Sequence, residues 1–287
     1  MASMSDIRHS IRSVSDMEQI TRAMHLISTS KMRKAVSKYE TNHTHFVRVR
    51  ATMKDILKHT RGLSHPYLTE GEGGKAAYVV IAADKGLCGG YNHNVLNLAY
   101  SAMQKKADSY ILTVGQEARV FFERKGYTID VEFLHVAQNP SLYYARGITM
   151  DLLGLFDSGI MNEVYVVYTH FISAMRQEPR VLKLLPLSVS NFQDVEEEAQ
   201  YNAEMFYHPS PGEVFDTLVP QYIIGLVYGC LVSSLASEQC ARMIAMESAT
   251  NNAEERIADL TMQYNRARQA AITAEISEII GALEALS

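Results

Sequence analysis

The stretch from Met246 to Ala271, "MESATNNAEERIADLTMQYNRARQAA", carries two interleaved series of residues that each repeat every seven positions. The first series is Met246, Ala253, Leu260 and Ala267, and the second is Thr250, Ile257, Tyr264 and Ala271. A seven-residue repeat keeps these side chains on one side of a helix, which is the pattern of a coiled coil. Small residues between the large ones permit a partner helix to approach closely. The stretch therefore predicts a helix that packs lengthwise against another helix.

This helix is predicted to occupy residues 213–287. Pro220 is tolerated near a first turn or produces a kink, and Gly225 and Gly229 weaken the early part. A helix of roughly 70 residues, at about 1.5 Å a residue, would extend ~100 Å. That length exceeds a domain of this size, so the helix needs a further surface to bury its apolar side.

A second long helix is predicted within residues 1–62, because the chain from Ser5 to Lys58 contains neither proline nor glycine. Apolar residues recur there at helical spacing, at positions 7, 11, 14, 17, 20, 24 and 27 and again at 46, 49, 53 and 56. The two helices are expected to form an antiparallel pair. Twelve Lys and Arg oppose four acids between Arg8 and Arg61, whereas eight acids oppose four arginines from Ser237 onward. These charges either lie on two solvated helix faces or make the basic and acidic segments electrostatic complements of each other.

The middle of the chain, residues 75–190, alternates short β-like runs with helical ones. We expect strands at 77–83, 110–114, 128–133, 164–170 and 181–187, with helices near 94–106, 116–125 and 141–158. This alternation predicts βαβ crossovers and a mostly parallel sheet covered by helices. Residues 191–212 are acidic and then proline-rich, which is typical of a surface connection. The predicted fold class is therefore α/β, a Rossmann-like middle domain, plus a long antiparallel coiled coil.

A glycine-rich turn at Gly86, Gly89 and Gly90 raises the question of nucleotide binding. A phosphate-binding P-loop needs GxxxxGK followed by Ser or Thr, but Gly90 is followed by Tyr91 and Asn92. The spacing GxGxxG of dinucleotide sites is also absent. Glycines at such a turn more often serve tight geometry, so we expect no direct nucleotide binding and no cofactor.

Composition excludes further classes of protein. The three cysteines have no metal-ligand spacing and are expected to be reduced thiols. Motifs such as GxSxG and HExxH do not occur, so we predict neither catalytic residues nor a metal site. The basic segment lacks interleaved aromatic residues, which makes nucleic acid a poor candidate partner. No run of about 18 uninterrupted apolar residues indicates a membrane span, and "MASMSDIRHSIRSV" at the N-terminus lacks the apolar core of a secretory signal.

Three stretches resemble the gamma subunit of rotary F-type ATP synthases. They are "SVSDMEQITRAMHLISTSKMRKA" (13–35), "DKGLCGGYN" (84–92) and "ASEQCARMIAMESATNNAEERIADLTMQYNRARQAAITAEISEII" (236–280). Shorter similar stretches occur between them in the same order as in the family. The resemblance implies a non-catalytic rotor whose paired helices form a central shaft above an α/β foot domain. The implied partners are the alpha and beta subunits of the catalytic ring, the epsilon subunit and the membrane ring of c subunits.

The resemblance also implies individual contacts. Arg268 and Gln269 match polar residues that bind a beta-subunit loop, and Thr273 belongs to the same contact region. Lys85 matches a basic position in a turn that approaches an acidic segment of the beta subunit, although a solvated lysine explains it equally well. Departures from the family pattern, among them Asp16, Glu18 and Glu247, put charge contacts at those positions in doubt.

Two other functions remain open on the residues alone. A nucleotide-binding enzyme would bind ATP or NAD through the middle domain, and a coiled-coil scaffold or export-apparatus stalk would share the helices without rotating. A rotor would instead co-assemble with alpha and beta subunits. The resemblance implies a peripheral protein on the cytoplasmic face of a bacterial plasma membrane. The alternative is an inner organellar membrane after removal of a presequence.

Overall fold

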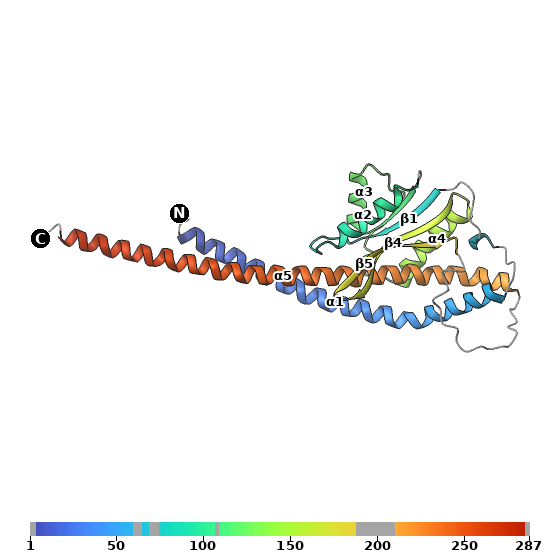
Figure 1. Cartoon of the computed structure of the whole chain (residues 1–287), viewed down its shortest axis with the longest axis horizontal. Coiled ribbons are helices and arrows are strands. Elements are labelled where there is room, and N and C mark those ends of the chain that lie inside the picture. Colours follow the sequence, from blue (N-terminus) through green and yellow to red (C-terminus); the bar gives the residue numbers. More distant parts are fainter. Residues whose placement is uncertain (1–3, 60–64, 69–74, 107–108, 188–209, 285–287) are drawn as a thin grey trace. The chain divides into compact units, whose positions relative to one another are not determined.

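The structure, a computed structural model, describes residues 4–59, 65–68, 75–106, 109–187 and 210–284. The chain divides into two compact units. The helical-pair unit consists of Met1–Thr29 and Arg242–Ser287, and the sheet unit consists of Ser30–Ala241. Two long helices, α1 (Met4–His59) and α5 (Pro211–Glu284), each contribute to both units (Figure 1). The expected connection at 191–212 lies largely outside the described residues.

Both long helices have identifiable sequence causes. α1 contains no helix breaker over its 56 residues. α5 begins with Pro211 at its first position, where a missing N–H costs nothing. Ser210 caps this end, because its hydroxyl accepts from the Glu213 N–H at 3.3 Å and donates to the Glu213 carboxylate at 3.2 Å. The helix then continues through Pro220. The prediction of a long helix at each end of the chain is confirmed.

The helical-pair unit contains an antiparallel seam, with the ends marked N and C on the same side of this unit in Figure 1. α1 buries Ile7, Thr21 and Ser28 in it, spaced by multiples of seven residues. α5 contributes buried residues from both predicted series: Met246, Thr250, Ala253 and Leu260. The small side chains among these residues allow the close approach of the two helices that the sequence predicted.

The apolar series predicted for α1 is only partly buried. Met17, Ile20 and Ile27 are 63%, 60% and 56% exposed, so a single apolar stripe does not form the seam. The reason is that the seven-residue repeat places Thr21 and Ser28 at the contact, where small side chains fit. The larger apolar side chains lie beside the seam and leave an apolar flank on α1.

The sheet unit contains a five-stranded sheet in the order β3-β2-β1-β4-β5. The strands are β1 (Lys75–Ile81), β2 (Ser109–Val114), β3 (Val131–Phe133), β4 (Met161–Ser173) and β5 (Arg176–Leu185). The first four are parallel and β5 pairs antiparallel with β4, so the prediction of a mostly parallel sheet is confirmed. The crossovers contain α2 (Tyr91–Met103), α3 (Gln116–Arg124) and α4 (Leu142–Asp157), and a short helix η1 spans Pro66–Leu68.

Helices cover both faces of this sheet. In β1, Ala77, Val79 and Ile81 point into a core shared with α1, α4 and α5, while the alternate residues pack into a second core with α2 and α3. Burial on both faces explains why β1 has no charged residue after Lys75. By length and composition α5 contains one window able to cross a membrane, but 61% of that window is buried, as in a core helix.

Candidate functional site

The glycine-rich turn, residues 84–90, connects β1 to α2 and is filled by its own side chains. The Ala83 N–H donates to the Asn92 side-chain oxygen at 3.0 Å. The Asn92 amide in turn donates to the Cys88 sulfur at 3.5 Å, and Cys88 is only 2% exposed. The Asn92 side chain, which follows the glycines, therefore closes the turn by its bonds to Ala83 and Cys88.

The base of the turn is held against α3. Asp84 accepts a hydrogen bond from the Gln116 N–H at 3.2 Å, and the Glu117 N–H donates to the Ala83 carbonyl at 3.1 Å. Gly115 is required here, because a Cβ at this position would lie 2.2 Å from the Ala82 carbonyl oxygen. These contacts make the turn a rigid projection between two helices.

The outer side of the turn presents Lys85 and Leu87, both exposed. Leu87 has φ +60° and is 66% exposed. A leucine in the left-handed region carries backbone strain, and Gly89 follows at φ +55°. Strained residues held by surrounding structure concentrate at functional positions. Leu87 was missed at the sequence level, because nothing in the glycine-rich stretch indicated that a leucine after Gly86 adopts a positive φ.

The C-terminal part of α5 forms the second candidate surface. Residues 268–280 are all exposed, and α5 continues past the N-terminal end of α1 within the helical-pair unit (Figure 1). Arg268, Gln269 and Thr273 lie here on consecutive turns of one helix. The Thr273 hydroxyl donates back to the Gln269 carbonyl at 2.9 Å. The structure thus brings these three residues together, and it holds Lys85 in the other unit.

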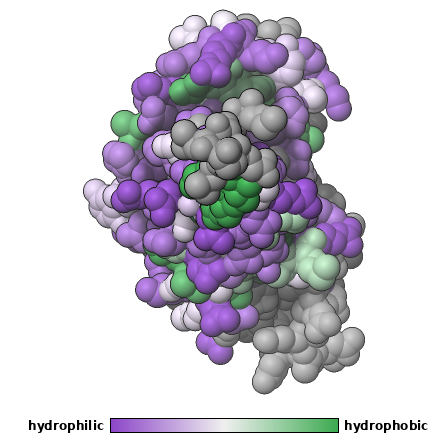
Figure 2. Space-filling view, turned by 90° about the vertical axis from the view of Figure 1, so that its left-hand side faces the viewer, coloured by the Kyte–Doolittle hydropathy of each residue, from purple (hydrophilic) through white to green (hydrophobic). Residues whose placement is uncertain are grey.

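The same part of α5 carries an apolar stripe. Ile272, Ile276, Ile279 and Ile280 are between 47% and 60% exposed, and they recur at helical spacing. In the end-on view of Figure 2, a small apolar area lies at the near end, surrounded by mostly hydrophilic surface. Within the part of the chain that the structure describes, these isoleucines stay exposed, and an exposed apolar stripe is typical of an interaction surface.

Burial favours the neutral form of two side chains, Tyr91 beside the turn and Cys230 in the core. Burial raises the pKa of the Tyr91 phenol, and the nearby Glu238 carboxylate raises this pKa further. Burial likewise raises the pKa of the Cys230 thiol. Among the described residues, no group of three or more His, Cys, Asp or Glu side chains is placed to hold a metal ion.

Comparisons with known proteins identify the family. A family model described as "ATP synthase" matches residues 3–286. An ATP synthase gamma chain from Alkaliphilus metalliredigens is 45% identical over 99% of this chain and 98% of its own length. The gamma chain from Ruminiclostridium cellulolyticum is 44% identical with the same coverage, and the sodium-ion-specific gamma chain from Acetobacterium woodii is 38% identical over 98% of each chain.

Solved structures agree on the fold. A chain of the Euglena gracilis mitochondrial ATP synthase, in an assembly described as OSCP/F1/c-ring, superposes with a TM-score of 0.68. It is 17% identical and covers 99% of this chain and 94% of its own. A chain of the Tetrahymena thermophila mitochondrial ATP synthase, in a structure described as central stalk/c-ring, has a TM-score of 0.60 at 23% identity, covering 80% of this chain and 99% of its own. Since bacterial relatives are 45% and 44% identical over nearly the whole chain, the chain belongs to the ATP synthase gamma chain family.

Proposed function

We propose that this chain is the rotating central shaft of an F-type ATP synthase, without catalytic chemistry of its own. It would couple the ion-driven turning of a membrane ring to ATP synthesis, and ATP hydrolysis to the reverse turning. The observation that carries this proposal is the end of α5, where residues 268–280 stand exposed with four isoleucines on the surface. An exposed apolar stripe of this kind is typical of a surface that a partner protein covers.

The partners proposed are the alpha and beta subunits of the catalytic ring, the epsilon subunit and the c-ring. The similarity to chains of assemblies described as rotor, F1 and c-ring supports them. We place the chain at a membrane-associated complex, on the cytoplasmic face of a bacterial plasma membrane. The bacterial origin of the gamma chains that it resembles favours this over an organellar membrane.

Rotation would act through differences in contact energy. Each orientation of an asymmetric shaft touches the three catalytic subunits differently, and a contact that stabilises one conformation more than another shifts the equilibrium between them. The nucleotide affinity of each catalytic subunit then follows its conformation, which is a coupling of free energies between distant sites. The two sides of the shaft differ here, since α1 has an apolar flank at Ile20 and Ile27.

Specific contacts to the beta subunit are proposed at Arg268, Gln269 and Thr273, and at Lys85. Arg268 offers five N–H donors and Gln269 offers both a donor and an acceptor, so the pair suits a polar loop. Lys85 offers a positive charge to an acidic segment. We add Leu87 to this surface, since the closed turn directs it outward beside Lys85.

The proposed domains follow the long helices and the sheet. Residues 1–62 and 213–287 would form the two shaft helices, and residues 75–190 would form the foot domain. Residues 191–212 would form a surface connection between the foot and the second helix. The observed span of α1 and α5 and the five strands within 75–185 support this division.

Reconstitution tests the proposal. The full chain, mixed with alpha and beta subunits, should form a complex that hydrolyses ATP, whereas calorimetry of the chain alone should detect no ATP binding. A chain that stays monomeric in the presence of alpha and beta subunits would contradict the rotor function. Micromolar binding of ATP or NAD, abolished by Gly89→Val, would instead favour a nucleotide-binding enzyme.

A further inference from the structure

The strand order β3-β2-β1-β4-β5 contains a point where the direction of the crossovers reverses. α2 and α3 pack in the core on one face of the sheet and α4 packs in the core on the other face, so this switch point lies between β1 and β4. In open α/β sheets, ligands bind outside the carboxyl ends of the two strands at the switch point. What lies there therefore bears on what the sheet unit can do.

Helix α5 occupies the β1 side of the switch point. Ala83, Cys88 and Tyr91 follow β1 and form a small buried cluster. Ala241 of α5 packs against this cluster. A helix of the same chain thus lies where such folds hold a ligand.

On the β4 side, the strand extends beyond the end of β1. The pairing of the two strands ends at Val80 and Val167, whereas β4 continues to Ser173. Alternate residues of a strand direct their N–H groups to the same edge, so Thr169 and Phe171 direct theirs to the edge that β1 has left. A buried backbone N–H needs a hydrogen-bond partner.

Three serines of α5 supply the partners at this edge. The Ser234 hydroxyl accepts from the Thr169 N–H at 3.3 Å. The Ser233 hydroxyl accepts from the Phe171 N–H at 2.8 Å. The Thr169 carbonyl accepts from the hydroxyls of Ser233 and Ser237 at 3.3 and 3.4 Å. All three serines are at most 4% exposed, so these bonds are made away from water.

The row of contacts continues to the turn between β4 and β5. Cys240, three residues after Ser237, donates from its thiol to the Ala174 carbonyl at 3.0 Å. The Gln177 side chain of β5 donates to the Cys240 sulfur at 3.5 Å. Residues three and four apart lie on one face of a helix, so one side of α5 follows the end of β4 from Ser233 to Cys240.

The positions of the serines make this contact sensitive to rotation of α5 about its own axis. A shift by one residue turns a helix by about 100°. Such a turn would carry the hydroxyls away from β4 and leave the buried N–H groups of Thr169 and Phe171 without partners, which is unfavourable. The apolar contacts of the same part of α5 are non-directional. The hydroxyls therefore select one rotational setting of the helix.

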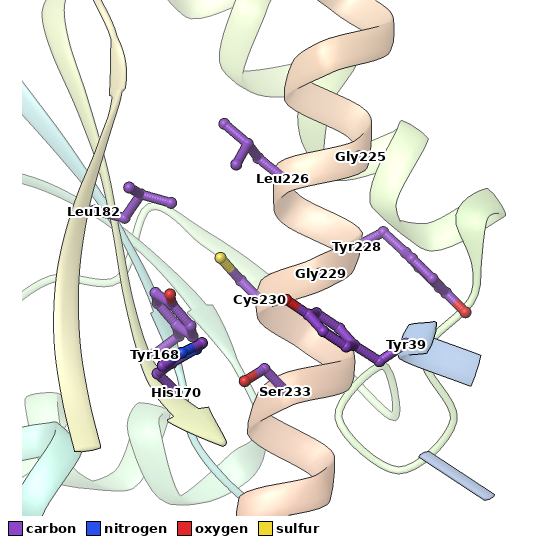
Figure 3. A pocket seen from close by; sticks show the side chains of 10 residues that line it. All are labelled: Tyr39, Tyr168, His170, Leu182, Gly225, Leu226, Tyr228, Gly229, Cys230 and Ser233. Atoms are coloured by element: carbon purple, nitrogen blue, oxygen red, sulfur yellow. The ribbon is translucent and has the colours of Figure 1, made fainter. Parts of the chain in front are cut away.

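The turns of α5 before the serines contribute less to this setting. Gly225 and Gly229 line a cavity of about 100 Å³. Among the described residues, a Cβ at Gly229 would meet only the Tyr39 ring, at 3.9 Å. Figure 3 shows this region, with Ser233 one turn further along α5 and its hydroxyl directed toward His170 of β4. The glycines provide no side chain to interlock with the strands, so the hydroxyls that follow them determine the setting.

We propose that Ser233, Ser234 and Ser237 are positioning residues that fix the rotational setting of α5 within the sheet unit, so that torque passes between the sheet and this helix. The inference rests on the proposed rotor function, in which the foot domain and the shaft must turn together. α5 continues as one helix from the sheet unit into the helical-pair unit. A turn of the sheet is thereby transmitted along α5 toward residues 268–280.

The angular fluctuation of the sheet unit tests the proposal. A thiol probe at Tyr143→Cys, where the native side chain is 82% exposed on α4, reports the angle of the sheet unit in complexes whose alpha and beta subunits are fixed to a surface. Between ATP-driven steps, the variance of this angle is inversely proportional to the torsional stiffness between the probe and the ring. The triple change Ser233→Ala, Ser234→Ala and Ser237→Ala should increase the variance at least about twofold, because a satisfied polar network rigidifies a buried contact.

The control is Phe122→Leu, which leaves a cavity in the core on the other face of the sheet, where the described core residues include none from α5. It should lower the unfolding temperature and leave the angular variance as in the unchanged chain, whereas a general effect of stability would appear in both variants. Equal variance in the serine variant and the unchanged chain would overturn the proposal. An unchanged chain that does not turn would contradict the rotor function instead.

Hydrogen exchange of the full chain tests the contact independently of rotation. The amides of Thr169 and Phe171 should exchange at least about tenfold faster in the serine variant, whereas the Leu112 amide in β2 should be unaffected. If the triple variant fails to fold, Ser233→Ala alone removes the bonds to the Phe171 N–H and the Thr169 carbonyl, and it should produce the same changes to a smaller extent. Unaltered exchange in a folded variant would also overturn the proposal.

Discussion

The hydroxyl of Thr21 on α1 lies 2.8 Å from the hydroxyl of Thr250 on α5, inside the seam of the helical-pair unit. Each hydroxyl also lies 2.9 Å from a carbonyl of its own helix, that of Glu18 for Thr21 and that of Met246 for Thr250. A hydroxyl has one proton, so one threonine donates across the seam while the other donates within its helix. A buried polar pair of this kind fixes the register of two helices.

Removal of one hydroxyl should therefore weaken the seam. Thr21→Val keeps the side-chain shape and leaves Thr250 without its cross-helix partner, at an expected cost of about 1 kcal/mol in unfolding free energy. The double variant with Thr250→Val should cost less than the sum of the two single changes, because both hydroxyls are then absent. Denaturant unfolding of the full chain, followed by helical circular dichroism, measures this coupling.

The matched control is Thr261→Val on the exposed side of α5, where the hydroxyl bonds only to the Ile257 carbonyl. It should change the unfolding free energy by less than about 0.5 kcal/mol. Strict additivity of the Thr21 and Thr250 substitutions would show that the two hydroxyls do not interact.

The seam also shows where sequence reasoning succeeds and where it fails. The lack of breakers predicted α1, and the seven-residue series predicted the buried Met246, Thr250 and Leu260. The contact side of α1 was not predictable from hydrophobicity, because Thr21 and Ser28 are polar. Close packing of two helices favours small side chains at the contact. A hydrophobicity scale does not measure the size of a side chain, so it does not identify these positions.

In the sheet unit, too, the sequence predicted some features and missed others for physical reasons. The strands of the parallel core were predicted because burial on both faces makes them apolar throughout. β4 (Met161–Ser173) and β5 (Arg176–Leu185) approach each other more closely in sequence than the predicted 164–170 and 181–187, and the Ser233 and Ser234 hydroxyls of α5 accept from the N–H groups of Phe171 and Thr169 on β4. Leu87 was missed because its exposure depends on a left-handed φ, which composition does not reveal for leucine.

Leu87 offers a test of the proposed turn surface. Leu87→Gly removes the strain of a leucine at positive φ, so the folded chain should be as stable as before or more stable by about 1 kcal/mol. If Leu87 contacts the beta subunit, ATP synthesis by the reconstituted complex should fall nonetheless. Leu87→Asn keeps the turn but lacks the apolar side chain, so ATP synthesis should fall with this variant too. Full synthesis with both variants would remove Leu87 from the partner surface.

Glu163 on β4 should contribute to the acid sensitivity of the sheet unit. Its carboxylate pairs with Lys106 and, at 3.3 Å, with Lys183. Burial raises the pKa of Glu163, but the hydrogen bonds and charges of the two lysines lower it more, so the net pKa lies below 4.5. The folded chain then holds this proton less tightly than the unfolded chain. The stabilisation is present above the unfolded pKa and is lost as the pH falls through the folded pKa.

Glu163→Gln should therefore be less stable than the unchanged chain at neutral pH and should lose less stability on acidification. Thermal unfolding between about pH 7 and pH 3 compares the two slopes. Asp151→Asn, an exposed change on α4, is the control and should keep the slope of the unchanged chain. Equal slopes for Glu163→Gln and the unchanged chain would show that the lysine pair does not stabilise the folded carboxylate.

The end of α5 carries the proposed contact with the catalytic ring. Both Arg268 and Gln269 are exposed. Arg268→Ala combined with Gln269→Ala should therefore leave the fold intact, with a change in unfolding free energy of less than about 0.5 kcal/mol. ATP synthesis or assembly of the complex should fall, since the polar contacts to the beta subunit would be lost. Gln263→Ala, an exposed change on the same helix, is the control. Undiminished ATP synthesis in the double variant would exclude these residues from the contact.

The most direct test of the rotor function is observation of turning itself. Cys88, Cys230 and Cys240 are at most 3% exposed, so a thiol probe attached to Met175→Cys, where the native side chain is 96% exposed, labels a single surface position. With the alpha and beta subunits fixed to a surface, ATP should drive the probe around in one constant direction. A probe that stays still while the same complexes hydrolyse ATP would contradict the account.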